Sequence, residues 1–410
     1  MGETVSTGVL GGRWRATVTP WGGIEPWPVD GGDAPAGLDW HIAADDRWHS
    51  PIREAAVRQT RVEGTAVVET RVKIPNGDAV QRVYSVPDHG GLTVIEIENE
   101  SPLAIVVAFT HGNLLSVRPP SAPIEGIDLP PGSVAFPLGH HATLTVALPH
   151  DGRGPGTLPS GLPPVAGVVR GWLSMVERAA RLLVPDPLLA ERLVSLRCEL
   201  ALGGPEHPDD DPVGFLLGVS QLVRMGEQAD PWMPDVAAAL EAAAKAGPHD
   251  WAFTAALDAA DVVFAAANDR RARGDLAKMR AAVPAVDDAP SSAPTDPSRL
   301  LAWSERRLVL PTADGAHLLP GGLPEGWAGD HFEVYGLPNG QGGTVSFAVR
   351  WHGARPAVLW EQTAPGATLR APLLAPDWAS AELKGETLWP EPQGLVPPPM
   401  APPAEGESFS

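Results

Sequence analysis

The sequence of 410 residues has almost no cysteine and no long apolar run. Its one cysteine, Cys198, excludes an intramolecular disulfide and zinc sites built on paired cysteines, which favours a reducing compartment. No stretch approaches the roughly 20 apolar residues of a membrane span, and the N-terminus lacks the pattern of a secretory signal. We therefore predict a cytoplasmic protein that does not associate with membranes, in which Cys198 is a buried, inert thiol of a helix.

Basic residues are also scarce. Lys and Arg number 30 against 50 Asp and Glu, so the formal charge is −20, and nucleic acid would be repelled. The chain has no Gly-x-Ser-x-Gly elbow and no glycine-rich turn between a strand and a helix. His140 and His141 are adjacent beside a strand, so they point to opposite faces and cannot share a metal. We expect no nucleic-acid partner, no cofactor and no metal.

Residues 1–150 have the pattern of antiparallel β-structure. Apolar and polar side chains alternate with period two over residues 68–74, and the run AVQRVYSV follows Asn76-Gly77, which predicts a hairpin with a type I′ turn. Further strands are expected at LTVIEIE, LAIVVAF and ATLTVAL. Strands that follow one another without helices between them predict a large sandwich.

The pattern changes to helical spacing after residue 164. Asp-Pro pairs at Asp186, Asp211 and Asp230 mark helix starts, with Asp250 before Trp251 as a variant, because Asp caps free amides and Pro fits the first helical position. Two further helices are expected near 166–183 and 269–282. The sequence thus predicts about six helices packed as antiparallel hairpins.

Strand-like runs return near the C-terminus at RLVLPT, FEVYGLP, TVSFAVRWH and ARPAVLWEQ. About 150 residues per domain predicts two or three domains. The predicted organisation is a β-sandwich domain (1–150), a linker (151–164), an α-helical domain (165–283), a Pro- and Ser-rich linker (284–298), a C-terminal β-domain (299–392) and a flexible tail (393–410).

Two segments carry a family resemblance. The run AHLLPGGLPEGWAGDHFEVYGLPNGQGGTVSFAVRWHG, residues 316–353, resembles the C-terminal β-domain motif of the (α/α)-toroid glycoside hydrolases and phosphorylases, the clan of glucoamylase-like and bacterial α-fucosidase-like enzymes. GDAVQRVYSV with LTVIEIENESPLAIVVAF is similar to their N-terminal sandwich. The resemblance implies a multidomain α+β fold: an N-terminal antiparallel β-supersandwich, an α-helical toroid and a small C-terminal β-sandwich.

The helical region departs from that family in length. A full toroid has about twelve helices, whereas only the roughly 120 residues between 165 and 283 are available, so we expect a short, half-toroid-like domain. These enzymes hold their general acid and general base on loops of different helix pairs. Loss of half the helices could remove one of the two carboxylates, and the sequence leaves open whether the protein is an enzyme.

Cleavage of a glycoside needs two carboxyl groups that flank the bond. The candidate catalytic residues are Glu206 and Asp209, in an acidic Gly-Pro loop with Asp210 and Asp211; Glu199 is a second candidate. The alternative, which the sequence favours, is a solvated acidic loop in which Asp211 caps a helix.

Tryptophan is the prevalent aromatic residue, with 14 Trp against 2 Tyr and 8 Phe. Sugar rings stack on indole as other apolar bodies do. The candidate substrate-binding residues are Trp21, Trp27, Trp40 and Trp48, which are interleaved with Asp30, Asp33, Asp39, Asp45 and Asp46. The alternative, which we favour, is that these rings close the sandwich edge and join domains.

Trp232 and Trp251 occupy corresponding first-turn positions of two helices and are further candidates for substrate binding. Their alternative role is a pair of hydrophobic staples against neighbouring loops. Asp258 and Asp261 share a helix face away from the apolar stripe, so we expect both carboxylates to be exposed.

Two functions remain open. The first is a glycoside-hydrolase-like protein that binds, and at most weakly hydrolyses, an oligosaccharide or polysaccharide. The alternative is an inactive interaction scaffold on a glycosidase-derived fold, with a protein partner or a second copy of the chain. A weaker third hypothesis is an active glycosidase whose missing half-toroid a partner supplies. The sequence identifies neither a sugar nor an oligomeric state.

Overall fold

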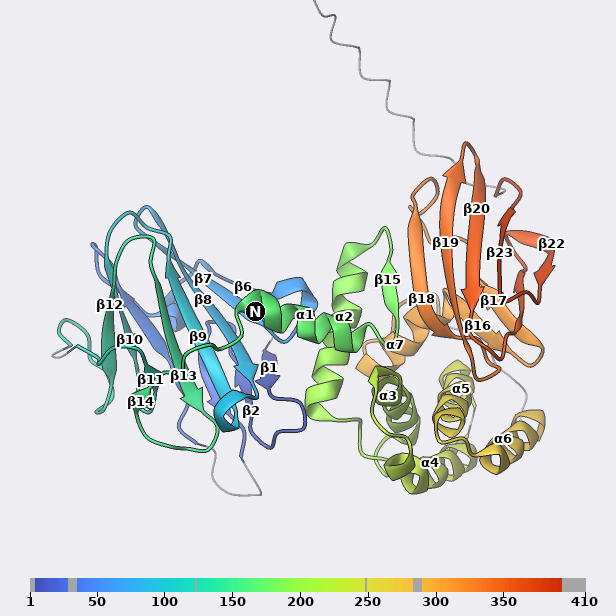
Figure 1. Ribbon diagram of the computed structural model, residues 1–410, viewed down its shortest axis with the longest axis horizontal. Coiled ribbons are helices and arrows are strands. Elements are labelled where there is room, and N and C mark those ends of the chain that lie inside the picture. The colour runs from blue at the N-terminus through green and yellow to red at the C-terminus, as the bar shows by residue number, and fades with distance from the viewer. Residues whose placement is uncertain (1–3, 29–34, 122–123, 248, 283–289, 393–410) are drawn as a thin grey trace, which may run out of the picture. The chain divides into compact units, whose positions relative to one another are not determined.

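The computed structural model describes residues 4–28, 35–121, 124–247, 249–282 and 290–392. In these residues the protein is a mixed α+β structure with seven α-helices and several mostly antiparallel sheets. The chain divides into two compact units (Figure 1), residues 1–176 with 191–204 and residues 177–190 with 205–410. The predicted tail, 393–410, lies outside the described residues, as does most of the predicted linker 284–298 up to residue 289.

Three β-sheets make up most of the first unit. The seven-stranded sheet has the order β14 (Gly156–Thr157), β11 (Leu115–Ser116), β13 (Thr143–Pro149), β9 (Leu92–Asn99), β8 (Gly77–Val86), β7 (Val68–Ile74) and β6 (Val57–Arg61). The four-stranded sheet has the order β12 (Val134–Leu138), β10 (Ile105–Phe109), β4 (Trp40–Ala43) and β5 (Trp48–His49), and the three-stranded sheet has the order β1 (Val5–Gly8), β2 (Arg15–Val18) and β3 (Ile24–Pro26). The helix α1 (Val165–Val176) and most of α2 (Pro187–Gly203) complete the unit.

One core joins the three sheets. Val18, Ile42, Ile95 and Phe136 come from different strands and are at most 1% exposed. The predicted alternation over residues 68–74 is confirmed, because every second side chain of β7 is buried. Burial of apolar faces from stacked sheets is the arrangement of a β-sandwich.

The hairpin between β7 and β8 exists, but its predicted type I′ turn is wrong. Ile74 pairs with Gly77, so Pro75 and Asn76 form the turn. Asn76 has φ of 59°, whereas the proline ring fixes a negative φ, which is the pattern of a type II turn. Gly77 is needed for another reason: a β-carbon there would lie 2.7 Å from the backbone of Ser101.

The α-helices in the described part of the second unit are α3 (Pro212–Met225), α4 (Met233–Ala246), α5 (Trp251–Ala266), α6 (Arg270–Ala282) and α7 (Pro297–Arg306). The starts of α3 and α5 were predicted correctly, whereas Asp230 begins a 3-10 turn (Asp230–Trp232) that precedes α4. Asp211 caps α3 through the amide of Gly214, and Asp250 caps α5 through two amides. No helix in the described part of the chain has the length and apolar character needed to cross a membrane.

Two expectations for the helices need correction. The helix expected over 166–183 ends at Val176, and Arg181–Leu183 form the strand β15. Val184 precedes a proline, which disfavours helical backbone, and β15 gains a pairing with β18 that sequence spacing does not reveal. The helix α7 was not predicted, although its first residues repeat the Asp-Pro signal.

Two sheets form the β-structure of the second unit. The five-stranded sheet has the order β15, β18 (Phe332–Pro338), β19 (Thr344–His352), β20 (Arg355–Gln362) and β23 (Lys384–Leu388). The four-stranded sheet has the order β16 (Val309–Thr312), β17 (Gly315–Leu318), β21 (Thr368–Ala371) and β22 (Ala375–Ser380). Val334, Phe347 and Leu369 are among the buried side chains between them. The helix α7 contacts α3, α5 and β16, which places it between the helices and the sheets of this unit.

His150 is half-buried in the first unit, where it stacks on Trp14. Their ring centroids lie 4.0 Å apart at an interplanar angle of 8°, and Nε2 of His150 shares a hydrogen bond of 2.9 Å with Oγ1 of Thr93. Burial lowers the pKa of His150 to about 4. The native state therefore holds a neutral imidazole at pH values where a solvated histidine is protonated.

We expect this site to make folding stability depend on pH. An unfolded histidine binds its proton near pH 6.5, and folded His150 binds it only near pH 4, so between these values the unfolded state binds more protons and stability falls as the pH is lowered. Urea denaturation at about pH 7 and about pH 5 measures the loss. His150→Gln should reduce it, whereas His207→Gln, with a side chain that is 64% exposed, should not. Equal losses in the wild type and His150→Gln would contradict the assignment.

Candidate functional site

A cleft of the second unit is lined by residues of α3, α5, α6, α7, β16, β18 and β19. It consists of a cavity of about 60 Å³ and an adjoining cavity of about 310 Å³, which share Arg224, Asp258 and three other lining residues. We call the two cavities together the charged cleft, after the ionic side chains that line it: Arg178, Arg224, Arg280, Arg306, Asp258, Asp261 and Glu305.

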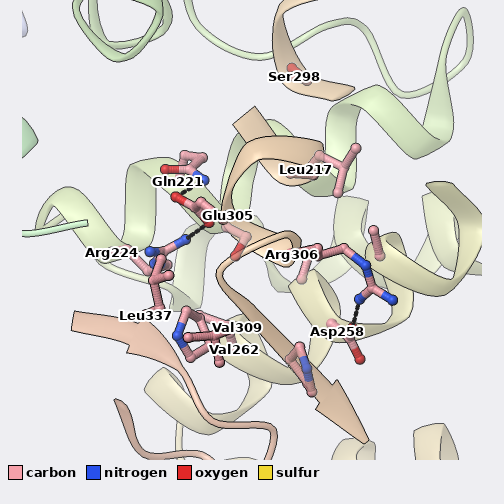
Figure 2. A pocket seen from close by; sticks show the side chains of 16 residues that line it. Leu217, Gln221, Arg224, Asp258, Val262, Ser298, Glu305, Arg306, Val309 and Leu337 are labelled. Atoms are coloured by element: carbon pink, nitrogen blue, oxygen red, sulfur yellow. Dashed lines mark hydrogen bonds and ion pairs between the residues drawn. The ribbon is translucent and has the colours of Figure 1, made fainter. Parts of the chain in front are cut away.

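The helix α7 supplies two of these side chains. It forms because Asp296 caps its first turn, where the carboxylate accepts a hydrogen bond of 2.8 Å from the amide of Arg299. Consecutive helical residues point about 100° apart, so Glu305 and Arg306 leave the helix in different directions. Figure 2 shows Glu305 pointing toward α3 and Arg306 toward α5.

Glu305 forms a buried ion pair with α3. Arg224 donates to Oε2 of Glu305 over 2.6 Å, and Nε2 of Gln221 donates to Oε1 over 3.0 Å. The Arg224 and Glu305 side chains are only 9% and 10% exposed. Arg224 also donates to the carbonyl of Ala179, so one guanidinium holds α3, α7 and the segment before β15 together.

Asp258 and Asp261 of α5 were expected to be exposed, but their side chains are only 13% and 14% exposed and line the cleft. Arg280 of α6 donates to Asp258 over 2.5 Å, and Arg306 of α7 donates to the same carboxylate. Asp261 accepts two hydrogen bonds of 2.8 and 3.1 Å from Arg273, which raise the pKa of that arginine. The positions of Asp258 and Asp261 within α5 could not show that their arginine partners lie on α6 and α7.

The glycine-rich connection between β18 and β19 forms part of the cleft wall. Asn339, fully buried, accepts hydrogen bonds from the amides of Gln341 and Gly343 at 3.0 and 3.1 Å, which fixes the turn. A β-carbon at Gly340 would lie 2.9 Å from Cβ of Pro311, so the close approach of the loop requires glycine there.

The charges of the cleft nearly cancel. Four guanidinium groups and three carboxylates line it, a formal charge of +1 in a chain of −20. No aromatic ring is among the lining residues. Each carboxylate accepts hydrogen bonds from a guanidinium. The cleft therefore offers hydrogen-bond donors and acceptors together.

The predicted catalytic residues Glu206 and Asp209 lie elsewhere. Both are exposed in the loop before α3, the Asp209 side chain is 91% exposed, and neither lines the charged cleft. The alternative explanation fits this loop better. Asp211 caps α3 as predicted, and its hydrogen bonds from Arg299, at 2.6 and 3.0 Å, lower the pKa of Asp211.

The tryptophans between residues 21 and 48 are engaged within the first unit. Trp40 is 1% exposed, so it lies in the core and has no ring face for a sugar. The other three are partly buried, and each indole N–H already has an acceptor: Asp39 for Trp21, Thr17 for Trp27 and the carbonyl of Glu125 for Trp48. Asp30 and Asp33 lie outside the described residues.

The helical tryptophans serve packing. Trp251 is 8% exposed in a cluster with Leu217 and Trp303, which excludes the expected sugar contact. Trp232 lies edge-on to Phe215 and donates to Glu227 over 3.2 Å. Both therefore fit their alternative role as staples.

The remaining candidates in α2 are structural. Glu199 accepts hydrogen bonds from the amide of Ser6 and, over 2.6 Å, from Arg61. Cys198 is buried as predicted, and burial raises the pKa of its thiol to about 12. A thiol with that pKa is not a nucleophile near neutral pH.

Comparison with known proteins gives no relative for this chain: neither a family model nor a curated protein matches it.

We expect Arg224→Met to destabilise the protein by about 3–5 kcal/mol, because it removes the guanidinium that pairs with the buried Glu305 carboxylate. The double variant Arg224→Met, Glu305→Leu should recover much of that loss, since it removes both charges. Urea denaturation of the single and double variants measures the coupling.

Lys245→Met is the matched control. Lys245 and Glu241 form an exposed pair, with side chains 73% and 68% exposed, so this change should cost less than about 1 kcal/mol. A double variant that is no more stable than Arg224→Met would contradict the importance of the ion pair.

Proposed function

We propose that this protein binds a neutral, polyhydroxylated ligand, a segment of an oligosaccharide, in the charged cleft. The observation that carries the proposal is the set of four guanidinium groups and three carboxylates whose charges nearly cancel. A sugar hydroxyl both donates and accepts hydrogen bonds, so it can bridge such groups, whereas a strongly anionic or cationic ligand meets as much repulsion as attraction.

The size of the cleft supports the same ligand class. A cavity of about 310 Å³ that continues into one of about 60 Å³ is at the lower end of small-molecule sites and suits one or two sugar rings. The resemblance to the toroid glycosidases supports the assignment independently, and with it we propose their layout for the chain: an N-terminal supersandwich, a half-toroid-like helical domain and a small C-terminal β-sandwich.

We infer that the cleft binds without efficient hydrolysis. Glycoside cleavage needs one carboxyl group that is protonated and a second that is ionised. Asp258, Asp261 and Glu305 each accept hydrogen bonds from an arginine, so all three carboxylates are engaged within the protein and none is free to act on a glycosidic bond. The ligand would be held and not cleaved.

A second candidate function is the interaction scaffold. The outer face of the five-stranded sheet exposes apolar side chains on three strands: Tyr335 is 39% exposed, Leu359 41% and Leu388 44%. A protein partner or a second copy of the chain could cover them.

A thermal-shift screen against a panel of oligosaccharides tests the first function. A ligand at 100 times its dissociation constant adds about 2.7 kcal/mol to stability, so we expect a clear rise in melting temperature with one glycan class and no release of reducing sugar. Asp261→Asn should abolish the rise. Asp275→Asn, an exposed aspartate of α6 paired with Lys278, is the matched control and should retain it.

The three possible failures have different meanings. If no glycan raises the melting temperature, ligand binding is refuted and the scaffold becomes the better proposal. An equal rise in Asp261→Asn would place the ligand outside the charged cleft. Release of reducing sugar that Asp258→Asn abolishes would overturn binding without hydrolysis.

A further inference from the structure

A groove of about 440 Å³ lies in the first unit, between the start of α1 and the seven-stranded sheet. Its walls come from α1 and the residue before it, from β8 and β9, and from the turn of residues 62–65 that follows β6. The volume is within the range of about 300–1,000 Å³ that is typical of small-molecule sites. We call this cavity the α1 groove. It shares no residue with the charged cleft, so a site here goes beyond the proposed function.

Two charged side chains of the α1 groove have no ionic partner. Glu63 of the turn and Arg170 of α1 both line the groove and are both exposed, so a ligand can reach them. Within the described part of the chain, neither side chain takes part in an ion pair or a hydrogen bond. The groove therefore offers one free carboxylate and one free guanidinium.

The other two charged side chains of the groove, Arg82 and Glu96, lie opposite each other on β8 and β9. Arg82 donates to Glu69 and Glu98, each over 2.8 Å, so its charge is already balanced. Glu96 accepts a hydrogen bond of 2.7 Å from the hydroxyl of Tyr84, but it forms no ion pair among the described residues. The half-buried Glu96 thus adds a second carboxylate that lacks a cation.

The backbone at Glu63 is unusual for a glutamate. The φ angles of Glu63 and Gly64 are 51° and 72°, and the amide of Thr65 donates to the carbonyl of Val62 over 3.0 Å. This is the pattern of a type I′ turn, which Gly, Asn and Asp favour because other side chains adopt a positive φ at a cost. The turn itself does not favour glutamate, yet this residue supplies the free carboxylate of the groove. Strained backbone of this kind is found most often at functional sites.

The rest of the groove wall that a ligand can reach is apolar. Val62, Pro164, Val165 and Ala166 line it, and none of these four residues is buried. They can contact the apolar body of a ligand while its charged ends reach the ionic side chains.

We propose that the α1 groove binds a zwitterion with an apolar body, which is the chemistry of a short apolar peptide with free termini and of a single apolar amino acid. Arg170 pairs with the carboxylate, and Glu63 and Glu96 pair with the ammonium group. A purely anionic ligand is repelled by the two glutamates, and a purely cationic one by Arg170. A neutral ligand leaves all three charges without a counter-charge, and it forgoes hydrogen bonds that are about twice as strong as neutral ones.

Titration of the full chain, followed by ligand-observed NMR, tests this site. The probes are leucine, the dipeptide leucyl-leucine, and two blocked forms of the dipeptide, one acetylated at its amine and one amidated at its carboxylate. We expect leucine or the free dipeptide to bind, and each blocked dipeptide to bind at least about tenfold more weakly than the free one, because each lacks one of the two charges. The ratio of the first two affinities shows whether the ligand is a peptide or an amino acid.

Glu63→Gly separates binding from folding. Glycine adopts a positive φ without strain, so the melting temperature should not fall, whereas the affinity for the free dipeptide should fall at least about fivefold. His89→Gly is the matched control. His89 has φ of 54° and precedes Gly90 in a turn with the same hydrogen bond, but it does not line the groove, so this variant should keep the wild-type affinity. Arg170→Met should abolish the difference in affinity between the free and the amidated dipeptide.

The proposal is overturned if neither leucine nor the free dipeptide binds at millimolar concentration, or if both blocked dipeptides bind as well as the free one. It is also overturned if Glu63→Gly and Arg170→Met both keep the wild-type affinity, or if His89→Gly loses as much affinity as Glu63→Gly. Asp261→Asn should leave dipeptide binding unchanged, so the failure of the charged cleft as a glycan site would not be mistaken for a failure of the α1 groove.

Discussion

The ion pair between Arg224 and Glu305 is the interaction on which the second unit depends. Both side chains are about nine-tenths buried, so their mutual attraction is screened little by water, and the loss of either would remove a close counter-charge from the other. Arg224 also holds the carbonyl of Ala179. One guanidinium thus sets the position of α7 against α3 and of the segment that leads into the edge strand β15.

The position of α7 in turn determines the walls of two cavities. Its two faces carry different chemistry: Glu305 and Arg306 take part in an ionic network with α3 and α5, while Trp303 and Ser304 line a separate cavity with Trp327. A helix of ten residues therefore separates a polar cleft from a cavity with tryptophan in its wall.

Local sequence signals predicted many of the helices and strands, whereas the candidate site depends on contacts between residues that lie far apart in the sequence. The alternation of apolar and polar residues predicted β7, and Asp211 and Asp250 correctly predicted helix starts. Both signals work because helix capping and the pleat of a strand depend on residues that are close in the sequence. The cleft could not be found in this way. Asp258 binds arginines 22 and 48 residues further along the chain, and Arg224 binds a glutamate 81 residues away. The start of α7 carries an Asp-Pro pair like the other helices, and this local signal is sufficient to predict it.

Stability alone does not account for the composition of the charged cleft. Replacement of buried ion pairs by apolar side chains of similar volume is often neutral or stabilising, because the desolvation of two charges offsets their attraction. If the contacts between these helices and strands served stability alone, they could therefore be apolar, as the core between the two sheets of this unit is. The cleft instead places seven ionic groups around cavities that have room for a ligand. The proposed recognition of a hydroxyl-rich molecule would account for that arrangement, because such a ligand binds through both donors and acceptors.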